Sequence, residues 1–248
     1  MTTRIASPNR LDRFALVLIT AMLGCLGVAF APSMFCAGLL QGAILMAIYG
    51  AFTNTSELLM YAPMLAAFPF IGYPFGVAVQ RLTPHTIDAF LSSIDFGIGL
   101  QAYDWTLAHP AWHQVLVWSY VEIGLVGAIA ICISPRRREL FAACAIGALT
   151  APIFYVLFPA VGPALPASAG RNCIPSMHTA WALMFWHYSS RETAPFFFVF
   201  LLLTLAATLG LGEHYLIDLV AALPFTAAVC WLASRYPAEI RAPAIPTP

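Results

Sequence analysis

Long apolar segments follow one another along this chain, separated by short polar breaks. The first, residues 14–31, has no charged residue, and the next two cover about residues 34–52 and 58–79. A helix needs about twenty apolar residues to cross a bilayer. Because a backbone in lipid must satisfy its own hydrogen bonds, such segments fold as helices packed side by side. The pattern predicts an all-α, polytopic integral membrane helical bundle.

Five further apolar segments bring the prediction to about eight transmembrane spans. They cover about residues 112–134, 140–158, 176–190, 195–211 and 214–232. The chain is 61% hydrophobic and 9% charged, which no ordinary soluble domain shows. The span starting at Ser176 is short, so the residues at its start are expected below the membrane surface.

The segment between Arg81 and His109 has a different pattern. Three aspartates, Asp88, Asp95 and Asp104, interrupt its apolar residues at helix-like spacing. This predicts an interfacial helix, with Asp95 and Asp104 on a solvated face, and the segment could line a route for lipid to reach the bundle.

All eleven cationic residues are arginines, and their distribution predicts an orientation. With the N-terminus in the cytoplasm, nine of them lie inside: Arg4, Arg10, Arg13, Arg136, Arg137, Arg138, Arg191, Arg235 and Arg241. Arg81 and Arg171 then lie on the outer, periplasmic or luminal, side. The net charge is zero, which gives no indication of a nucleic-acid partner.

Ionisable residues gather at the starts of the sixth and eighth spans. His178 follows Arg171 and Ser176, and His214 is followed four residues later by Asp218. Residues four apart share a helix face, so Asp218 is expected to reach the His214 ring. A single histidine at a helix start is more often a cap than a catalyst. Together, with helix N-termini that favour anions, these groups suit a phosphate.

These residues resemble two motifs of the type-2 phosphatidic acid phosphatase superfamily. The motifs are Pro175-Ser-Met-His178 and His214-Tyr-Leu-Ile-Asp218, and the resemblance covers roughly residues 111–233. The Pro-Ser-Met-His form, with the upstream Phe158-Pro-Ala-Val-Gly-Pro163, is similar to the inositol phosphorylceramide synthase-like branch. The resemblance implies a six-helix phosphatase-like core in residues 111–248. Residues 1–110 would add N-terminal spans and the interfacial helix.

The resemblance also implies residue roles. His214 would be the nucleophile, Asp218 its orienting partner and His178 the acid, while Ser176 and Arg171 would bind phosphate. The wider superfamily has a first motif with lysine, which this chain lacks. It also has an arginine six residues before the nucleophilic histidine, where this chain has Thr208.

The predicted function is a membrane enzyme that cleaves a lipid phosphoester through a phosphohistidine. The phosphoryl-bearing group would pass to water, as in a lipid phosphatase, or to an alcohol, as in a phosphotransferase. The alternatives are a transporter, which an intramembrane Glu122 would suit, and a non-catalytic scaffold. No cofactor is expected and no metal-ligand spacing is present, so Cys173 is interpreted as a packing residue. The expected partners are a lipid phosphate or phospholipid substrate and membrane lipids; the sequence does not indicate an oligomeric state.

Overall fold

The computed structural model describes residues 79–80, 82–166, 169 and 173–235. Within these residues every regular element is a helix, so the all-α prediction is confirmed for this part of the chain. The helices are α4 (Asp88–Ile94), α5 (Ile98–Leu107), α6 (Pro110–Val121), α7 (Ile123–Ile133), α8 (Arg137–Leu157), α9 (Met177–His187), α10 (Ala194–Gly210) and α11 (Leu216–Ser234). The predicted spans 14–31, 34–52 and 58–79 lie outside the described residues, apart from Val79.

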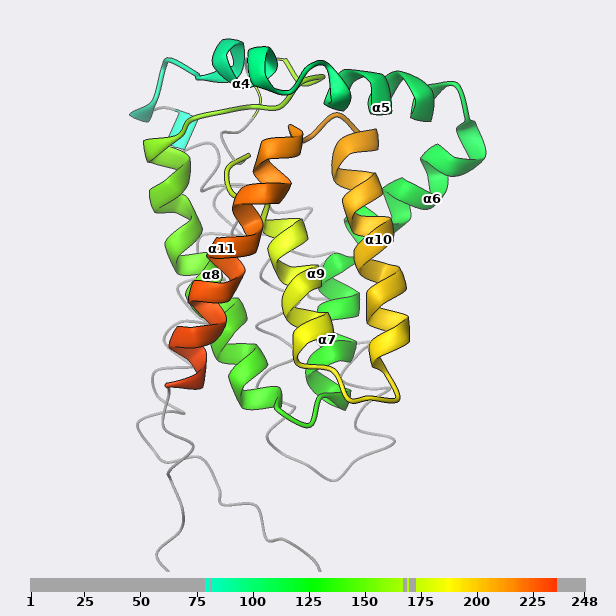
Figure 1. The fold of residues 1–248 in the computed structure, drawn as a ribbon, viewed down its shortest axis with the longest axis vertical. Coiled ribbons are helices and arrows are strands. Elements are labelled where there is room, and N and C mark those ends of the chain that lie inside the picture. The colour runs from blue at the N-terminus through cyan, green and yellow to red at the C-terminus, as the bar shows by residue number, and fades with distance from the viewer. Residues whose placement is uncertain (1–78, 81, 167–168, 170–172, 236–248) are drawn as a thin grey trace, which may run out of the picture.

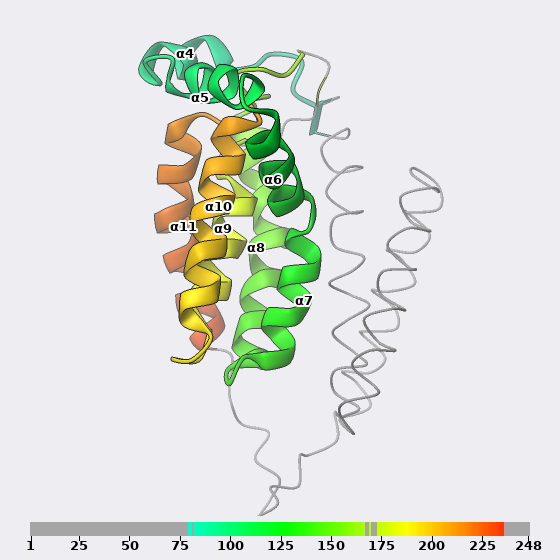
Figure 2. The ribbon, with the colours of Figure 1, turned by 90° about the vertical axis from the view of Figure 1, so that its right-hand side faces the viewer.

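Helices α7 to α11 run lengthwise side by side, and α4 and α5 lie across one end of this bundle (Figures 1 and 2). We name this the covered end. Helices α8 and α10 finish there, and α11 starts there (Figure 1). Helix α9 starts deeper in the bundle, as Figure 1 shows. The two chain segments that carry the histidine motifs therefore approach each other beneath α4 and α5.

Two described helices, α8 and α11, are long and apolar enough to cross a membrane. The count rises to three if α6 and α7 form one bent span. Helix α10 has 17 residues, and α9 has 11, fewer than predicted. At about 1.5 Å per residue, α9 is roughly 16 Å long, shorter than the hydrocarbon core of a bilayer. The predicted total of about eight spans is not confirmed by the described residues.

The predicted span over residues 112–134 consists of two helices, with a break at Glu122. Helices α6 and α7 meet there at an angle of 54°. Gly124, two residues further on, is a weak helix former and lies in the first turn of α7. As a result α7 packs on α9 and α8, whereas α6 packs on α10 and α5.

The segment predicted as one interfacial helix contains two, α4 and α5. They are joined by a turn at Phe96 and Gly97, which both have positive φ. Asp104 is exposed, as predicted, but the prediction that Asp95 is solvated is wrong: this side chain is 3% exposed. The polar face that carries Asp95 lies against the bundle, where backbone donors take the place of water.

The end opposite the covered end holds the positive charge of the described residues. Arg136, Arg137, Arg138, Arg191 and Arg235 all lie in or beside the connections and helix termini found there. Arg136 donates to the His187 carbonyl at 2.6 Å, and the Ser134 hydroxyl donates to the Tyr188 carbonyl at 2.7 Å. These bonds attach the α7–α8 connection to the C-terminus of α9. We name this the arginine end.

The outward faces of the bundle are strongly apolar. Exposed large apolar side chains occur on α6 to α8, α10 and α11, including Trp118, Leu149, Ile153, Phe196, Val199, Leu202, Val220, Leu223 and Trp231. Exposed apolar side chains on so many helices mark contact with lipid in a chain of this composition. The described bundle is therefore part of a membrane protein.

Candidate active site

The chain between α10 and α11 reverses direction sharply and carries His214. The His214 amide donates to the Thr208 carbonyl at 3.1 Å, which closes the reversal. Gly212 has φ +71°, and a Cβ there would lie 2.3 Å from the Ala164 Cβ. Gly162, opposite, has φ +121°, and its Cβ would lie 2.4 Å from the Glu213 carbonyl oxygen. Only glycine fits at both positions, so two loops pack closely and hold His214 in place.

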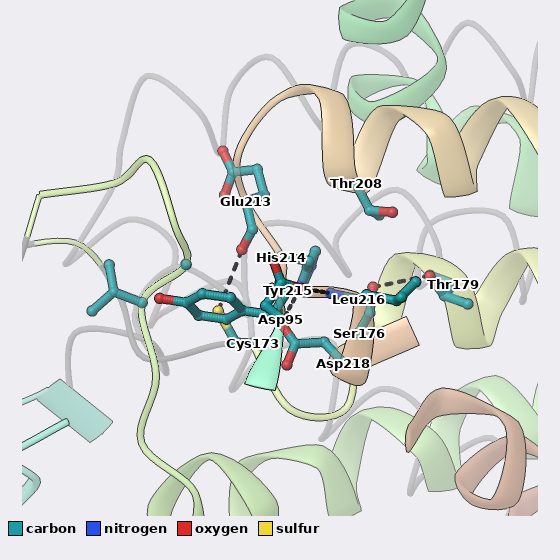
Figure 3. A network of polar contacts seen from close by, with 12 residues as sticks. Asp95, Cys173, Ser176, Thr179, Thr208, Glu213, His214, Tyr215, Leu216 and Asp218 are labelled. Carbon is teal, nitrogen blue, oxygen red and sulfur yellow. Dashed lines mark hydrogen bonds and ion pairs between the residues drawn. The ribbon is translucent and has the colours of Figure 1, made fainter. Parts of the chain in front are cut away.

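The His214 ring is bonded to Asp218 and both are buried. His214 Nδ1 lies 3.3 Å from Asp218 Oδ2 (Figure 3). The same oxygen accepts the Tyr215 amide at 2.8 Å. His214 is 2% exposed and Asp218 is 0% exposed. Because Nδ1 faces the carboxylate, Nε2 is the ring nitrogen left for chemistry.

Two carboxylates from the covering helices bind the loops around His214. Asp95 accepts the amide of Leu216, the first residue of α11, at 2.7 Å, and the Gly99 amide at 2.8 Å. Asp88 accepts the Val161 amide at 3.0 Å and the Tyr215 hydroxyl at 3.1 Å. The N-terminus of α11 is thus capped by Asp218 and by Asp95, and α4 and α5 are part of the site.

The second motif begins at the N-terminus of α9. Ser176 is the N-cap residue, fully buried, and its hydroxyl accepts the Thr179 amide at 3.4 Å (Figure 3). The Ser176 amide donates to the Asp218 carbonyl at 3.1 Å. This bond connects the two motifs directly. The first N–H groups of a helix have no partner within it, so α9 presents donors beside Ser176.

His178 lies on α9 and is half-buried. Its ring stacks on Tyr120 of α6, with centroids 3.7 Å apart and an interplanar angle of 17°. The edge of Trp181, one turn further along α9, lies 6.1 Å away. His178 follows Ser176 by two residues, in the first turn of α9, and Ser176 is bonded to the Asp218 backbone. The structure therefore brings together His178, His214, Asp218 and Ser176; Arg171, the predicted phosphate ligand, lies outside the described residues.

Cys173 is buried next to the His214 loop and donates its thiol to the Glu213 carbonyl at 3.3 Å. Burial, then the nearby carboxylates of Asp218, Asp88 and Glu213, raise the pKa of this thiol well above its ordinary value. A protonated thiol is a poor nucleophile and a poor metal ligand. Cys173, His214 and Asp218 have ligand atoms within 4.8 Å of one another and are the described group that could hold a metal ion. In this arrangement Cys173 Sγ and His214 Nδ1 are instead engaged in hydrogen bonds.

Among the described residues, the charged side chains at the covered end are acidic. Asp88, Asp95, Glu213 and Asp218 surround the His214 loop, while all the described arginines lie at the arginine end. Burial raises the pKa of Glu213, with an opposing effect from His214. Thr208 is fully buried and its hydroxyl donates to the Leu205 carbonyl at 2.9 Å. Where the wider superfamily has an arginine, this site therefore has a neutral hydroxyl.

Sequence reasoning did not identify Tyr120, Asp88 or Asp95 as site residues. Tyr120 is one aromatic residue in an apolar segment, which carries no signal by itself. The aspartates carried a signal, since three of them recur in a segment otherwise rich in apolar residues. That pattern is the same whether the polar face meets water or backbone amides, so it could not decide between the two.

The described residues form an all-helical bundle of a membrane protein, with two histidines and a carboxylate near two helix N-termini. A comparison with protein families identifies the class to which such a protein belongs. Residues 86–232, more than half of the chain, match the model of the PAP2 superfamily, and the chain belongs to this superfamily. No curated protein and no solved structure matches the chain significantly. Membership supports an enzyme of the phosphatase type that acts on lipid phosphates.

Proposed function

We propose that this protein cleaves a lipid phosphoester through a phosphohistidine formed on His214. The observation that carries the proposal is the buried pair of His214 and Asp218, held at 3.3 Å, next to the start of α9. The carboxylate orients the ring and offsets the positive charge that develops when the other nitrogen attacks phosphorus.

In the first step, the lone pair of His214 Nε2 forms a bond to phosphorus and the bond from phosphorus to the lipid oxygen breaks. The leaving oxygen takes the electron pair, and His178 donates a proton to it, so that the product is a neutral alcohol. The proton on His214 Nδ1 stays in its bond to Asp218. His178, in the first turn of α9, is the group we propose for this proton transfer.

In the second step, an acceptor hydroxyl attacks the phosphohistidine and the nitrogen–phosphorus bond breaks. His178, now neutral, takes the proton of the acceptor. Water as acceptor gives a phosphatase, and a lipid, sugar or inositol hydroxyl gives a phosphotransferase. The motif Pro175-Ser-Met-His178, with Phe158 to Pro163, favours the inositol phosphorylceramide synthase-like branch.

The phosphate charge would be met by Arg171, the Ser176 hydroxyl and the N-terminal N–H groups of α9. We place the site on the outer side of the membrane and the arginine end in the cytoplasm, which the concentration of described arginines at that end supports. We propose that the reaction needs no metal ion or cofactor.

A labelled lipid donor tests the function. Purified protein is incubated with a phosphatidic acid labelled in the phosphate, with and without candidate alcohols, and with EDTA in a parallel reaction. We expect release of phosphate or transfer to an alcohol, an acid-labile phosphoenzyme, and activity that survives EDTA. Loss of activity on chelation, restored by a divalent ion, would count against the phosphohistidine route and direct attention to Cys173, His214 and Asp218 as metal ligands.

Single cysteines at exposed positions test the orientation. Gln101 lies on α5 at the covered end and Arg191 lies in the connection at the arginine end, and both are exposed. An impermeant thiol reagent applied to intact cells should label Gln101→Cys above the background of the parent chain and should leave Arg191→Cys unlabelled. The reverse pattern would place the site in the cytoplasm.

A further inference from the structure

We propose that Tyr120 is a positioning residue for His178, holding its imidazole in the orientation needed to protonate the leaving oxygen. The inference rests on the proposed role of His178 as the acid. It concerns a residue in the last turn of α6, outside both histidine motifs.

The contact between the two rings is close and nearly parallel. Their centroids are 3.7 Å apart at an interplanar angle of 17°. His178 has one other described ring neighbour, the edge of Trp181, at 6.1 Å and 63°. Trp181 belongs to the same helix, so it cannot fix the position of His178 relative to other helices. Tyr120 is therefore the described ring that holds His178 from another element.

The break at Glu122 explains how Tyr120 reaches this position. Helix α7, which follows the 54° bend, packs on α9. Helix α6, which precedes the bend, packs on α10 and α5 instead. Tyr120, two residues before the break, is where α6 still contacts α9 through the His178 ring. The break thus places an aromatic face over the catalytic ring.

The stack with Tyr120 restrains the His178 imidazole from the side of α6. An imidazole without this neighbour could rotate about its side-chain bonds, and general acid catalysis fails when the donor leaves hydrogen-bond reach of the leaving oxygen.

The test uses substitutions at Tyr120 and two kinds of substrate. An alkyl lipid phosphate has a poor leaving group and needs the acid, whereas an activated aryl phosphate does not. We expect Tyr120→Leu to lower kcat on the alkyl substrate by about 10-fold or more, part of the 10²–10⁴ that general acids contribute, with little change on the aryl substrate. Tyr120→Phe keeps the ring face and should remain close to wild type on both substrates.

The control is Trp118→Leu, since Trp118 lies on the same helix and is 59% exposed. It should leave both rates unchanged. Equal losses on both substrates in Tyr120→Leu, no loss at all, or failure of Tyr120→Phe to retain activity would each overturn the positioning role. If Tyr120→Leu does not fold, Tyr120→Phe still tests the proposal. This variant keeps the stacked ring, so a large loss of activity in it would exclude the stack as the source of the effect of Tyr120.

His178→Ala, measured alongside, separates this inference from the proposed function. A leaving-group-dependent loss in His178→Ala with none in Tyr120→Leu rejects Tyr120 alone. No leaving-group dependence in His178→Ala rejects the acid role itself, and the proposal for Tyr120 with it.

Discussion

The N-termini of α9 and α11 lie together beneath the covering helices, but their first N–H groups have different partners. At α11, Asp218 accepts the Tyr215 amide at 2.8 Å and Asp95 accepts the Leu216 amide at 2.7 Å. At α9, the cap is the neutral Ser176 hydroxyl, 3.4 Å from the Thr179 amide. One helix start is occupied by carboxylates, and the other is not.

From this difference we infer distinct roles for the two helices in the proposed reaction. Carboxylates satisfy the donors of α11 and would repel a phosphate placed there, but they suit a nucleophile that becomes positively charged. The N-terminus of α9 keeps its partial positive charge for an anion. We therefore expect the phosphate to bind over the start of α9, between Ser176 and His178, with His214 attacking from the side of α11.

The largest expected effect is at His214, the proposed nucleophile. His214→Ala should abolish both turnover and phosphoenzyme formation, a loss of at least about 10⁶-fold, because no other described group is placed to attack. Asp218→Asn should fall between this variant and the wild type, since the ring is retained but loses its charged partner. Phosphoenzyme trapping with labelled donor measures both. Near-normal turnover in His214→Ala would break the comparison and leave a non-catalytic scaffold or another nucleophile.

The next effect is at His178, the proposed acid on α9, and depends on the leaving group. His178→Ala should slow reaction of an alkyl lipid phosphate by about 10²–10⁴-fold, while an activated aryl phosphate should change much less. The ratio of the two rates is the measurement. A loss of equal size on both substrates would mean that α9 does not supply the proton and acts through binding alone.

The contact between His214 and Asp218 could be predicted from the sequence, but for an incomplete reason. Residues four apart on a helix face each other, and this spacing led to the prediction. In the structure His214 precedes α11, and Asp218, at the third helical position, reaches back over the helix start to the ring and the Tyr215 amide. Helix capping depends only on residues close in the sequence, so this contact could be predicted from the sequence.

The parts that could not be predicted depend on distant residues. Asp95 is 121 positions from Leu216, and no periodicity in the sequence indicates that pair. The all-helical fold and most helix positions followed from the apolar segments. The break at Glu122 did not, because one charged residue in an apolar segment can be satisfied within a straight helix as well as at a bend.

A smaller effect is expected from a substitution at Asp95, which caps α11 but lies outside both histidine motifs. Asp95→Ala removes the acceptor for two amides, Leu216 and Gly99, each of which then costs about 1–3 kcal/mol if left unpaired. We expect lower thermal stability together with reduced turnover, because the start of α11, next to His214, loses its attachment to the α4–α5 connection. The control is Asp104→Ala on α5, which changes an exposed side chain and should change stability by less than about 0.5 kcal/mol. Equal effects in the two variants would show that the cap of α11 does not depend on Asp95.

The smallest effect concerns Glu213, a further carboxylate beside α11. Burial raises its pKa in the folded protein, while in the unfolded chain the carboxyl ionises near its ordinary value of about 4.3. Folding therefore favours the protonated form. The contribution of the protonated Glu213 to the stability of the folded protein is complete below about pH 4.3. It is lost as the pH rises through the raised pKa of the folded state. Glu213→Gln should match the wild type in acid and be slightly more stable at neutral pH, in thermal unfolding scans across this range.

Glu192, in the connection that leads from α9, supplies the matched control with the opposite sign. A hydrogen bond from Ser190 lowers its pKa, so its contribution is present above the ordinary value and is lost as the pH falls. Glu192→Gln should therefore be no more stable than the wild type at neutral pH, and the two should converge in acid. If the stability of Glu213→Gln depended on pH in the same way as that of Glu192→Gln, the Glu213 carboxyl beside α11 would not be desolvated. The contrast between the two helix starts would then rest on hydrogen-bond geometry alone.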